Sequence, residues 1–134
     1  MTWPPGAHAN TFGGNPVACA AANVTLQLLE DGLMANAEQR GQQLQAGLSR
    51  LAGNFKGISQ PRGKGLMLAI DIHDRQGNPD AAARDLLINE AFEHGLLLVG
   101  CGRAAIRFCP PLVIAAEQIA TALEILTQLL ENDR

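Results

Sequence analysis

The strongest constraint on the fold is the alternation in "LMLAIDI", residues 66–72, near the middle of the chain. Every second residue of this segment is a large aliphatic one, and Met67, Ala69 and Asp71 lie between them. Successive side chains of a strand point to opposite faces of a sheet, so this spacing predicts a strand with one buried face. The buried face holds Leu66, Leu68, Ile70 and Ile72. Such a strand needs partner strands and a layer that covers its apolar side.

Two helices are predicted before this strand. Asn15 as N-cap and Pro16 at the first helical position begin a helix that runs to about residue 30 and ends at Gly32. The first half of that helix is small and apolar all round, which indicates burial on several sides. A second helix over roughly 34–52 follows from an apolar stripe: Leu33, Ala37, Gly41, Leu44, Leu48 and Leu51.

Further elements follow the strand. Asp80 is expected to cap a helix that Gly95 ends, and a last helix over about 116–131 starts at Ala115, a poor N-cap residue. "LLLV" and "AIRFC" are predicted strands with a turn over 100–102 between them, and "GISQPRGKG" is a loop or an edge strand. The predicted fold is α/β: a two-layer α+β domain in which helices cover a small, mostly antiparallel sheet.

Composition excludes several functional classes. The chain has 134 residues, 47% of them hydrophobic and 17% charged, which is typical of one globular domain. A net charge of -3 and an aromatic content of 4% argue against nucleic acid as a partner. The sequence contains no apolar run long enough for a membrane span and no signal-peptide pattern, so no membrane partner is expected. Three cysteines without metal spacing fit a reducing cytoplasm, and Cys19 and Cys109 are predicted core residues.

The segment "HANTFGGNPVACAAA", residues 8–22, combines a hydroxyl, two glycines and a helix start. An anion-holding turn followed by a tightly packed helix has this order of residues. The alternative from the residues alone is an ordinary glycine-rich turn before a capped helix.

Three segments together resemble the C-terminal part of the class III, pyridoxal-phosphate-dependent aminotransferases. They are "GAHANTFGGNPVACAAA", "RGKGLMLAIDI" and "IRFCPPLVI", and their order and separations match that family over essentially the whole chain. The resemblance implies a fold-type I enzyme that is a homodimer, binds pyridoxal 5'-phosphate (PLP) and acts on a small amino acid and a 2-oxo acid. It also implies three parts: residues 1–15 as an active-site and interface segment of the large domain, 16–32 as a connecting helix, and 33–134 as the small C-terminal domain.

The resemblance assigns roles to three residues. It implies that the hydroxyl of Thr11 reaches the phosphate of the partner subunit's cofactor, with the Phe12 main-chain N–H as a second donor. It implies that Arg107 binds a carboxylate of the amino acid or the oxo acid. Strand alternation independently places Arg107 on the face opposite Ile106 and Phe108. The alternative for Arg107 is an ordinary surface ion pair.

No catalytic residue is assigned within the chain. The resemblance implies that neither Lys56 nor Lys64 is the Schiff-base lysine, which is expected upstream, so the fragment is expected to be inactive alone. Best-known relatives act on acetylornithine, ornithine or 4-aminobutyrate. The alternatives are an aminomutase, racemase or decarboxylase on the same scaffold, or a non-catalytic α/β dimerisation module.

The remaining polar candidates receive structural roles. His8 is expected to be exposed near the turn, His73 lies in a polar turn, and His94 suits the C-terminus of a helix. Asp71 is expected to pair with an arginine, without acting as a general base. The spacing of His, Cys and acidic residues predicts no metal site.

Overall fold

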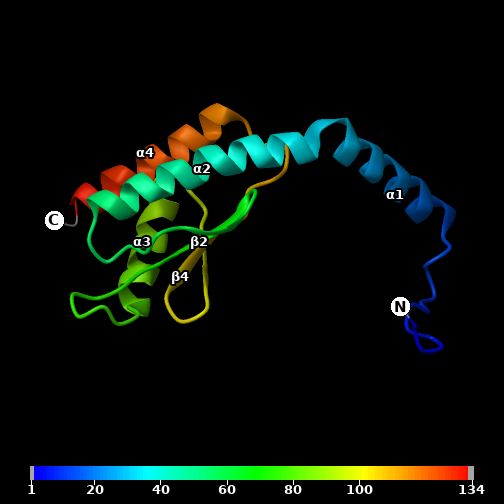
Figure 1. The fold of residues 1–134 in the computed structure, drawn as a ribbon, viewed down its shortest axis with the longest axis horizontal. Coiled ribbons are helices and arrows are strands. Elements are labelled where there is room, and N and C mark those ends of the chain that lie inside the picture. Colours follow the sequence, from blue (N-terminus) through cyan, green and yellow to red (C-terminus); the bar gives the residue numbers. More distant parts are fainter. Residues whose placement is uncertain (1, 133–134) are drawn as a thin grey trace. The chain divides into compact units, whose positions relative to one another are not determined.

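The computed structural model describes residues 2–132. The chain divides into two compact units, Met1–Met34 and Ala35–Arg134 (Figure 1). The first unit contains the helix α1 (Pro16–Leu28) and a π-helical turn (Leu29–Leu33). The second contains nearly all of α2 (Met34–Asn54), four strands and two further helices. The assignment of residues 1–15, 16–32 and 33–134 to parts of a larger enzyme stays a prediction.

The start of α1 forms as the sequence predicts. The side-chain oxygen Oδ1 of Asn15 accepts hydrogen bonds from the N–H groups of Val17 at 2.9 Å and Ala18 at 3.3 Å. Pro16 occupies the first turn, where its missing N–H costs nothing. Gly32 has a φ of 148°, outside the helical region, and it interrupts the helix there. The predicted N-cap and the predicted break at Gly32 are both confirmed.

The predicted burial of α1 is wrong for this chain. None of its residues is buried, and Val17 is 78% exposed. A helix buries an apolar face only against another element, and the first unit holds no second element of comparable length. Cys19 is therefore exposed, and Cys109, which lies just beyond a strand end, is exposed as well. The prediction that these two cysteines are core residues is wrong.

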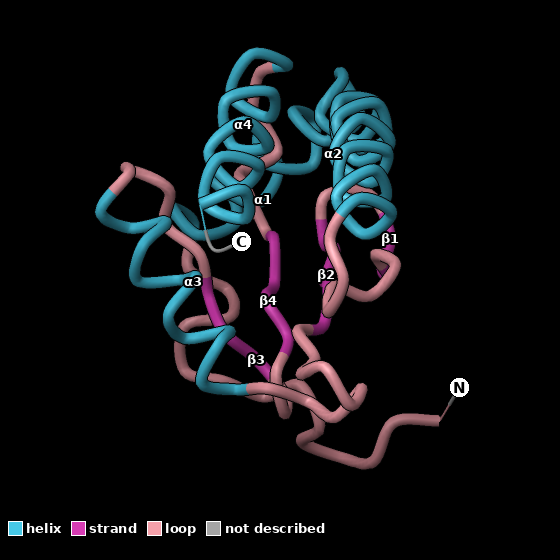
Figure 2. Tube along the Cα trace, turned by 90° about the vertical axis from the view of Figure 1, so that its left-hand side faces the viewer, coloured by secondary structure: helices cyan, strands magenta, loops and turns pink. Residues whose placement is uncertain are grey.

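The second unit is built on a four-stranded sheet (Figure 2). Its strands are β1 (Arg62–Lys64), β2 (Met67–Asp71), β3 (Val99–Cys101) and β4 (Ala105–Phe108), in the order β1-β2-β4-β3. All three neighbouring pairs are antiparallel. This open antiparallel sheet with helices is the predicted α+β fold class, and "GISQPRGKG" contributes its edge strand.

Three helices build the core against one face of this sheet: α2, α3 (Ala81–Glu93) and α4 (Ala116–Asn132). All four aliphatic residues of the predicted inner face of "LMLAIDI" are at most 7% exposed. The helices contribute Leu44, Leu48, Leu51, Leu87, Ala91, Ile119, Leu126 and Leu129 to the same core. On the opposite face, Met67 and Val99 are 60% and 47% exposed. That second face of the sheet, hereafter the open face, carries the polar side chains of the strands.

Close contact between α2 and the β1–β2 turn depends on a glycine. A Cβ atom built on Gly41 would lie 2.4 Å from the carbonyl carbon of Gly65, which is backbone and cannot rotate away. The backbone of α2 therefore rests directly on that turn. The sequence places Gly41 on the apolar stripe of the helix, and the structure shows that the stripe needs the absence of a side chain there.

Strand β3 begins three residues later than predicted. The predicted strand was "LLLV", 96–99, whereas the observed strand covers Val99–Cys101 and the turn covers residues 102–104. Gly100 lies within the strand, where it pairs with Ile106 of β4. The run of leucines before Val99 does not alternate with polar residues, so the sequence does not indicate where the strand begins.

Both remaining helices have side-chain caps. Asp80 accepts a hydrogen bond from the N–H of Ala83 at 2.9 Å, so the predicted N-cap of α3 is confirmed. At α4 the side chain of Gln118 reaches back to accept the N–H of Ala115 at 2.9 Å. This contact compensates for the poor N-cap residue in the way of a capping box. Within residues 2–132, no helix is both long and apolar enough to cross a membrane.

Candidate functional site

The turn before α1 offers two free hydrogen-bond donors to solvent. Its backbone closes through a hydrogen bond from the Asn15 N–H to the Phe12 carbonyl oxygen at 3.1 Å. Thr11 and Phe12 are both exposed, and the Phe12 side chain is 76% exposed. Within the described part of the chain, neither the Thr11 hydroxyl nor the Phe12 N–H has a hydrogen-bond partner. The Thr11 hydroxyl and the Phe12 N–H are therefore candidate donors for an anionic group.

The two glycines of this turn matter for the room that a missing side chain leaves, because their backbone angles are ordinary. Neither Gly13 nor Gly14 has a positive φ. A Cβ atom on Gly13 would lie 2.9 Å from Oδ1 of Asn10, so the Asn10 side chain packs directly against the turn. A Cβ atom on Gly14 would meet nothing within 4 Å, so this side of the turn is open. His8, exposed as predicted, stacks edge-on against Trp3 with 4.1 Å between ring centroids.

Arg107 lies on the open face of the sheet, in the second unit. Its neighbours Ile106 and Phe108 are buried on the other face, as the alternation predicts. The strand register places Arg107 opposite Ala69 of β2 and Val99 of β3. On the far side of Ala69, the register places Arg62 of β1. A single row across the open face therefore reads Arg62, Ala69, Arg107 and Val99.

Asp71 pairs with Arg62 and not with Arg107. Both carboxylate oxygens of Asp71 accept from the Arg62 guanidinium, one of them from Nη2 at 3.0 Å. The predicted pairing of Asp71 with an arginine is confirmed. Among residues 2–132, Arg107 has no ion-pair partner, so the surface ion pair that was its alternative role is not observed. Sequence reasoning missed Arg62, because only the register of β1 reveals which arginine meets Asp71.

A cleft of about 590 Å³ includes Arg107 in its lining. It lies beside α4, between the segment that precedes β3 and the segment that follows β4, and most of its lining is apolar. The remaining lining residues are Leu44, Leu96, Leu97, Leu98, Val99, Phe108, Cys109, Pro110, Pro111, Ile114, Gln118, Ile119 and Ala122. Several of its lining residues, among them Leu44, Phe108 and Ile119, also belong to the core.

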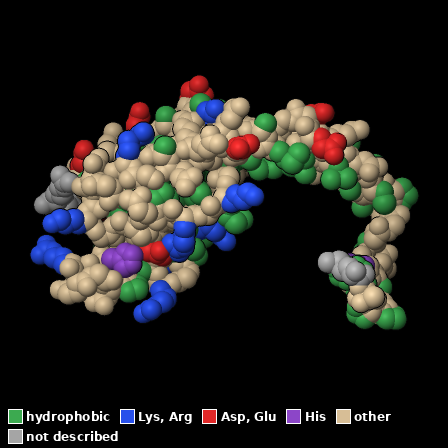
Figure 3. Space-filling model, in the orientation of Figure 1, with side chains coloured by type: hydrophobic (Ala, Val, Ile, Leu, Met, Phe, Trp, Pro, Cys, Tyr) green, Lys and Arg blue, Asp and Glu red, His purple; other side chains and the backbone are tan. Residues whose placement is uncertain are grey.

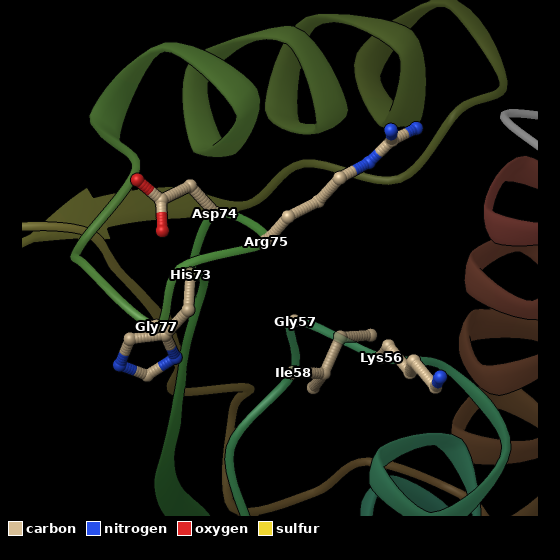
Figure 4. Close-up of a pocket in the computed structure, with 7 residues that line it drawn as sticks. All are labelled: Lys56, Gly57, Ile58, His73, Asp74, Arg75 and Gly77. Carbon is tan, nitrogen blue, oxygen red and sulfur yellow. The ribbon is translucent and has the colours of Figure 1, made fainter.

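A second hollow of about 820 Å³ contains none of the predicted site residues (Figure 4). Lys56 and Arg75 extend to one side of it, whereas His73 and Asp74 point to the other. Asp74 accepts hydrogen bonds from the N–H groups of Asn78 at 2.8 Å and Gln76 at 2.9 Å. These bonds, the one from Asn78 first, hold the pKa of the Asp74 carboxyl below its ordinary value. The carboxylate therefore stabilises the loop that contains it.

The remaining ionisable candidates lie in structural settings. Lys64 is on β1, and Lys56 follows α2. His94 is the C-cap of α3, where its Nδ1 lies 2.8 Å from the Glu90 carbonyl oxygen. In the part of the chain that the structure describes, no group of three or more His, Cys, Asp or Glu residues is arranged to hold a metal ion.

Residues 1–130 match the family model described as aminotransferase class-III. The chain belongs to the class III aminotransferase family. It is 48% identical over 124 residues to an acetylornithine aminotransferase of Gloeobacter violaceus, covering 91% of this chain and 29% of that protein. It thus spans less than a third of the length of that relative. Class III aminotransferases are PLP-dependent enzymes, so PLP is the cofactor of an intact enzyme of this family.

Solved structures of the family have the same fold. An acetylornithine aminotransferase from Elizabethkingia anophelis superposes with a TM-score of 0.83 at 35% identity, over 97% of this chain and 33% of that one. A phospholyase from Arthrobacter in complex with phosphoethanolamine gives a TM-score of 0.85 at 34% identity, over 91% and 30% of the two chains. The chain is therefore a piece of the fold-type I scaffold, and the match fits the C-terminal part of a class III aminotransferase.

Proposed function

We propose that this chain is the C-terminal part of an aminotransferase that moves an amino group from an amino acid, of the ω-amino type, to a 2-oxo acid. The observation that carries the proposal is Arg107, an exposed guanidinium on the open face with no acidic partner within residues 2–132. Family membership supplies the reaction class. Arg107 supplies a guanidinium that matches the carboxylate shared by amino acids and oxo acids.

Arg107 is proposed to bind the substrate carboxylate. A guanidinium presents two parallel N–H donors that match the two oxygens of a carboxylate. The apolar cleft beside it suits the carbon skeleton of the same molecule. The Gloeobacter violaceus relative favours acetylornithine as the amino donor.

Thr11 and Phe12 are proposed to hold the phosphate of PLP. The residues fit this group because a hydroxyl and a main-chain N–H are exposed side by side in one turn without partners within the described residues. Such donors bind a phosphate without adding positive charge. When bound, PLP supplies the electron sink for the substrate, and the protein supplies binding and orientation. In the homodimer that we propose, this turn serves the cofactor of the partner subunit.

The lysine that attaches the cofactor is proposed to come from a part of the enzyme outside these residues. Lys64 lies on an edge strand and Lys56 in a loop beside the second hollow. Neither is near Arg107 in the register of the sheet or in the lining of its cleft. The isolated chain is therefore expected to have no transaminase activity. A cytoplasmic location remains part of the proposal.

Other reactions on the same scaffold are the second candidate. The likeness to the Arthrobacter phospholyase supports a lyase as an alternative, beside an aminomutase, racemase or decarboxylase. A non-catalytic α/β dimerisation module is the remaining alternative. Product analysis separates these candidates, because only an aminotransferase consumes a 2-oxo acid in proportion to its amino donor.

The test compares two variants in the complete enzyme. Arg107→Lys keeps the charge and loses the bidentate fork, so kcat/KM for both substrates should fall by roughly 30- to 1000-fold, or about 2–4 kcal/mol. Thr11→Ala should instead weaken PLP retention and leave the ratio of kcat/KM values between carboxylate substrates nearly unchanged. Steady-state kinetics with acetylornithine and 2-oxoglutarate, beside a PLP titration, measure both effects.

Arg103→Lys is the matched control, because Arg103 is an exposed arginine in the turn between β3 and β4. It should leave both measurements unchanged. If Arg107→Lys behaves like this control, Arg107 does not bind the substrate carboxylate.

A further inference from the structure

We propose that Arg62 holds the Asp71 carboxylate away from Arg107 and thereby keeps Arg107 available for a carboxylate ligand. This inference rests on the proposed function, because it concerns the same carboxylate site. It gives Arg62 and Asp71 a positioning role, in which neither touches the ligand.

The strand register places Asp71 diagonally across from both arginines. Arg62 and Arg107 both pair with Ala69, one from each neighbouring strand. Asp71 lies two residues further along β2, so it shares the open face with them. Each arginine is therefore a diagonal cross-strand neighbour of Asp71. Diagonal neighbours lie about 7–8 Å apart at the backbone, within reach of long side chains.

The structure shows which of the two partners Asp71 takes. Its two oxygens are bound by the fork of Arg62, whose side chain is 55% exposed, and the side chain of Asp71 is 32% exposed. The backbone of Asp71 is held on the same side of the strand. Its N–H donates to the Ser59 hydroxyl at 2.8 Å, and its carbonyl oxygen accepts the Ser59 N–H at 3.0 Å.

This choice matters because Asp71 is the sole acidic residue in the four described strands. A carboxylate bound to Arg107 from within the chain would occupy the donors that a ligand needs. The ion pair with Arg62 on β1 instead engages the Asp71 carboxylate. Arg107 is left without an ion-pair partner within residues 2–132.

The experiment uses the complete enzyme with ¹⁵N-labelled arginine and follows the Nε–H signal of Arg107 by NMR. In Arg62→Gln, the signal should shift in the absence of any ligand, because Asp71 now pairs with Arg107. The dissociation constant for 2-oxoglutarate, used as the probe, should rise about two- to fivefold, which is the range of a partly exposed ion pair. Adding Asp71→Asn to that variant should restore both the signal and the affinity.

Two controls separate this role from general electrostatics and from a structural role. Lys64→Gln removes a positive charge from the same strand, Lys64 being exposed opposite Met67, and it should not shift the ligand-free Arg107 signal. Asp71→Asn alone should leave 2-oxoglutarate affinity unchanged or higher. A merely structural pair would instead make Arg62→Gln and Asp71→Asn weaken binding alike.

The failure of this inference is distinguishable from the failure of the proposed function. If 2-oxoglutarate does not perturb Arg107 in the unmodified complete enzyme, the carboxylate role of Arg107 is wrong. If the ligand binds there but the ligand-free signal of Arg107 is the same in Arg62→Gln, the holding role of Arg62 is wrong. An equal shift in Lys64→Gln would also overturn that role.

Discussion

The long helices of the two units differ in composition, and the more apolar one is the less buried. The helix α1 is rich in alanine and valine, yet none of its residues is buried. In the second unit, α2 has a more polar sequence and still buries Leu44, Leu48 and Leu51. Figure 3 shows apolar side chains exposed along the first unit. An apolar composition makes a helix face suitable for burial. The face becomes buried only where another helix or a sheet packs against it.

The candidate residues of the two units differ in the same way. Thr11 and Phe12 offer donors from an exposed turn, whereas Arg107 lies on a sheet whose other face is a packed core. Donors on the turn owe their position to local hydrogen bonds. The guanidinium of Arg107 owes its position to the long-range register of three strands.

The largest contrast is expected from truncating one aliphatic side chain in each unit. Leu48→Ala removes a side chain with 0% exposure and should lower the free energy of unfolding by about 2–5 kcal/mol. Val17→Ala, at 78% exposure, should change it by less than about 0.5 kcal/mol. Urea denaturation followed by circular dichroism measures both. A comparable loss in Val17→Ala would mean that α1 is buried in solution.

A sharper contrast comes from removing the same kind of N-cap in each unit. Asp80→Ala should cost about 1 kcal/mol of global stability, because α3 packs into the core through Leu87 and Ala91. Asn15→Ala should cost α1 a similar amount locally while leaving the main unfolding transition in place. Amide hydrogen exchange at Val17 and Ala18, beside a thermal melt, tests this. A lowered melting temperature in Asn15→Ala would contradict the separation of the two units.

The smallest expected effect concerns acid. The lowered pKa of Asp74 means that its carboxylate stabilises the loop fully above the ordinary carboxyl range and loses this effect as pH falls through the lowered value. Exchange-corrected protection of the Gln76 and Asn78 amides should decrease on acidification, and Asp74→Asn should remove that dependence. At the start of α1, the cap is Asn15, which does not ionise. Protection of Val17 should therefore stay independent of pH once intrinsic exchange is corrected.

Local sequence signals predicted most of the elements. The N-caps Asn15 and Asp80 and the alternation around Leu68 act within a few residues, so one sequence is enough to reveal them. Strand β3 was misplaced because its flanking run of leucines has no period. The burial of Cys19 and Cys109 was mispredicted because burial depends on which elements pack together, a property that residue type does not carry.

For the candidate site, the sequence indicates which residues are involved, and the structure shows how the charged ones pair. Thr11, Phe12 and Arg107 were named through the family resemblance, and their roles stay predictions. Within residues 2–132, Asp71 pairs with Arg62, and Arg107 has no acidic partner. Arg62 and Asp71 are nine residues apart, and their meeting depends on how β1 and β2 are aligned.

The contact between Gly41 and Gly65 has a consequence for that alignment. Because the α2 backbone packs directly against the β1–β2 turn at Gly65, a side chain at position 41 would displace that turn and the two strands that it joins. Slippage of β1 by one residue would turn Arg62 to the opposite face and leave Asp71 to Arg107. Two residues without side chains thus let α2 pack closely on the strands that carry Arg62 and Asp71, from the face of the sheet opposite to that ion pair.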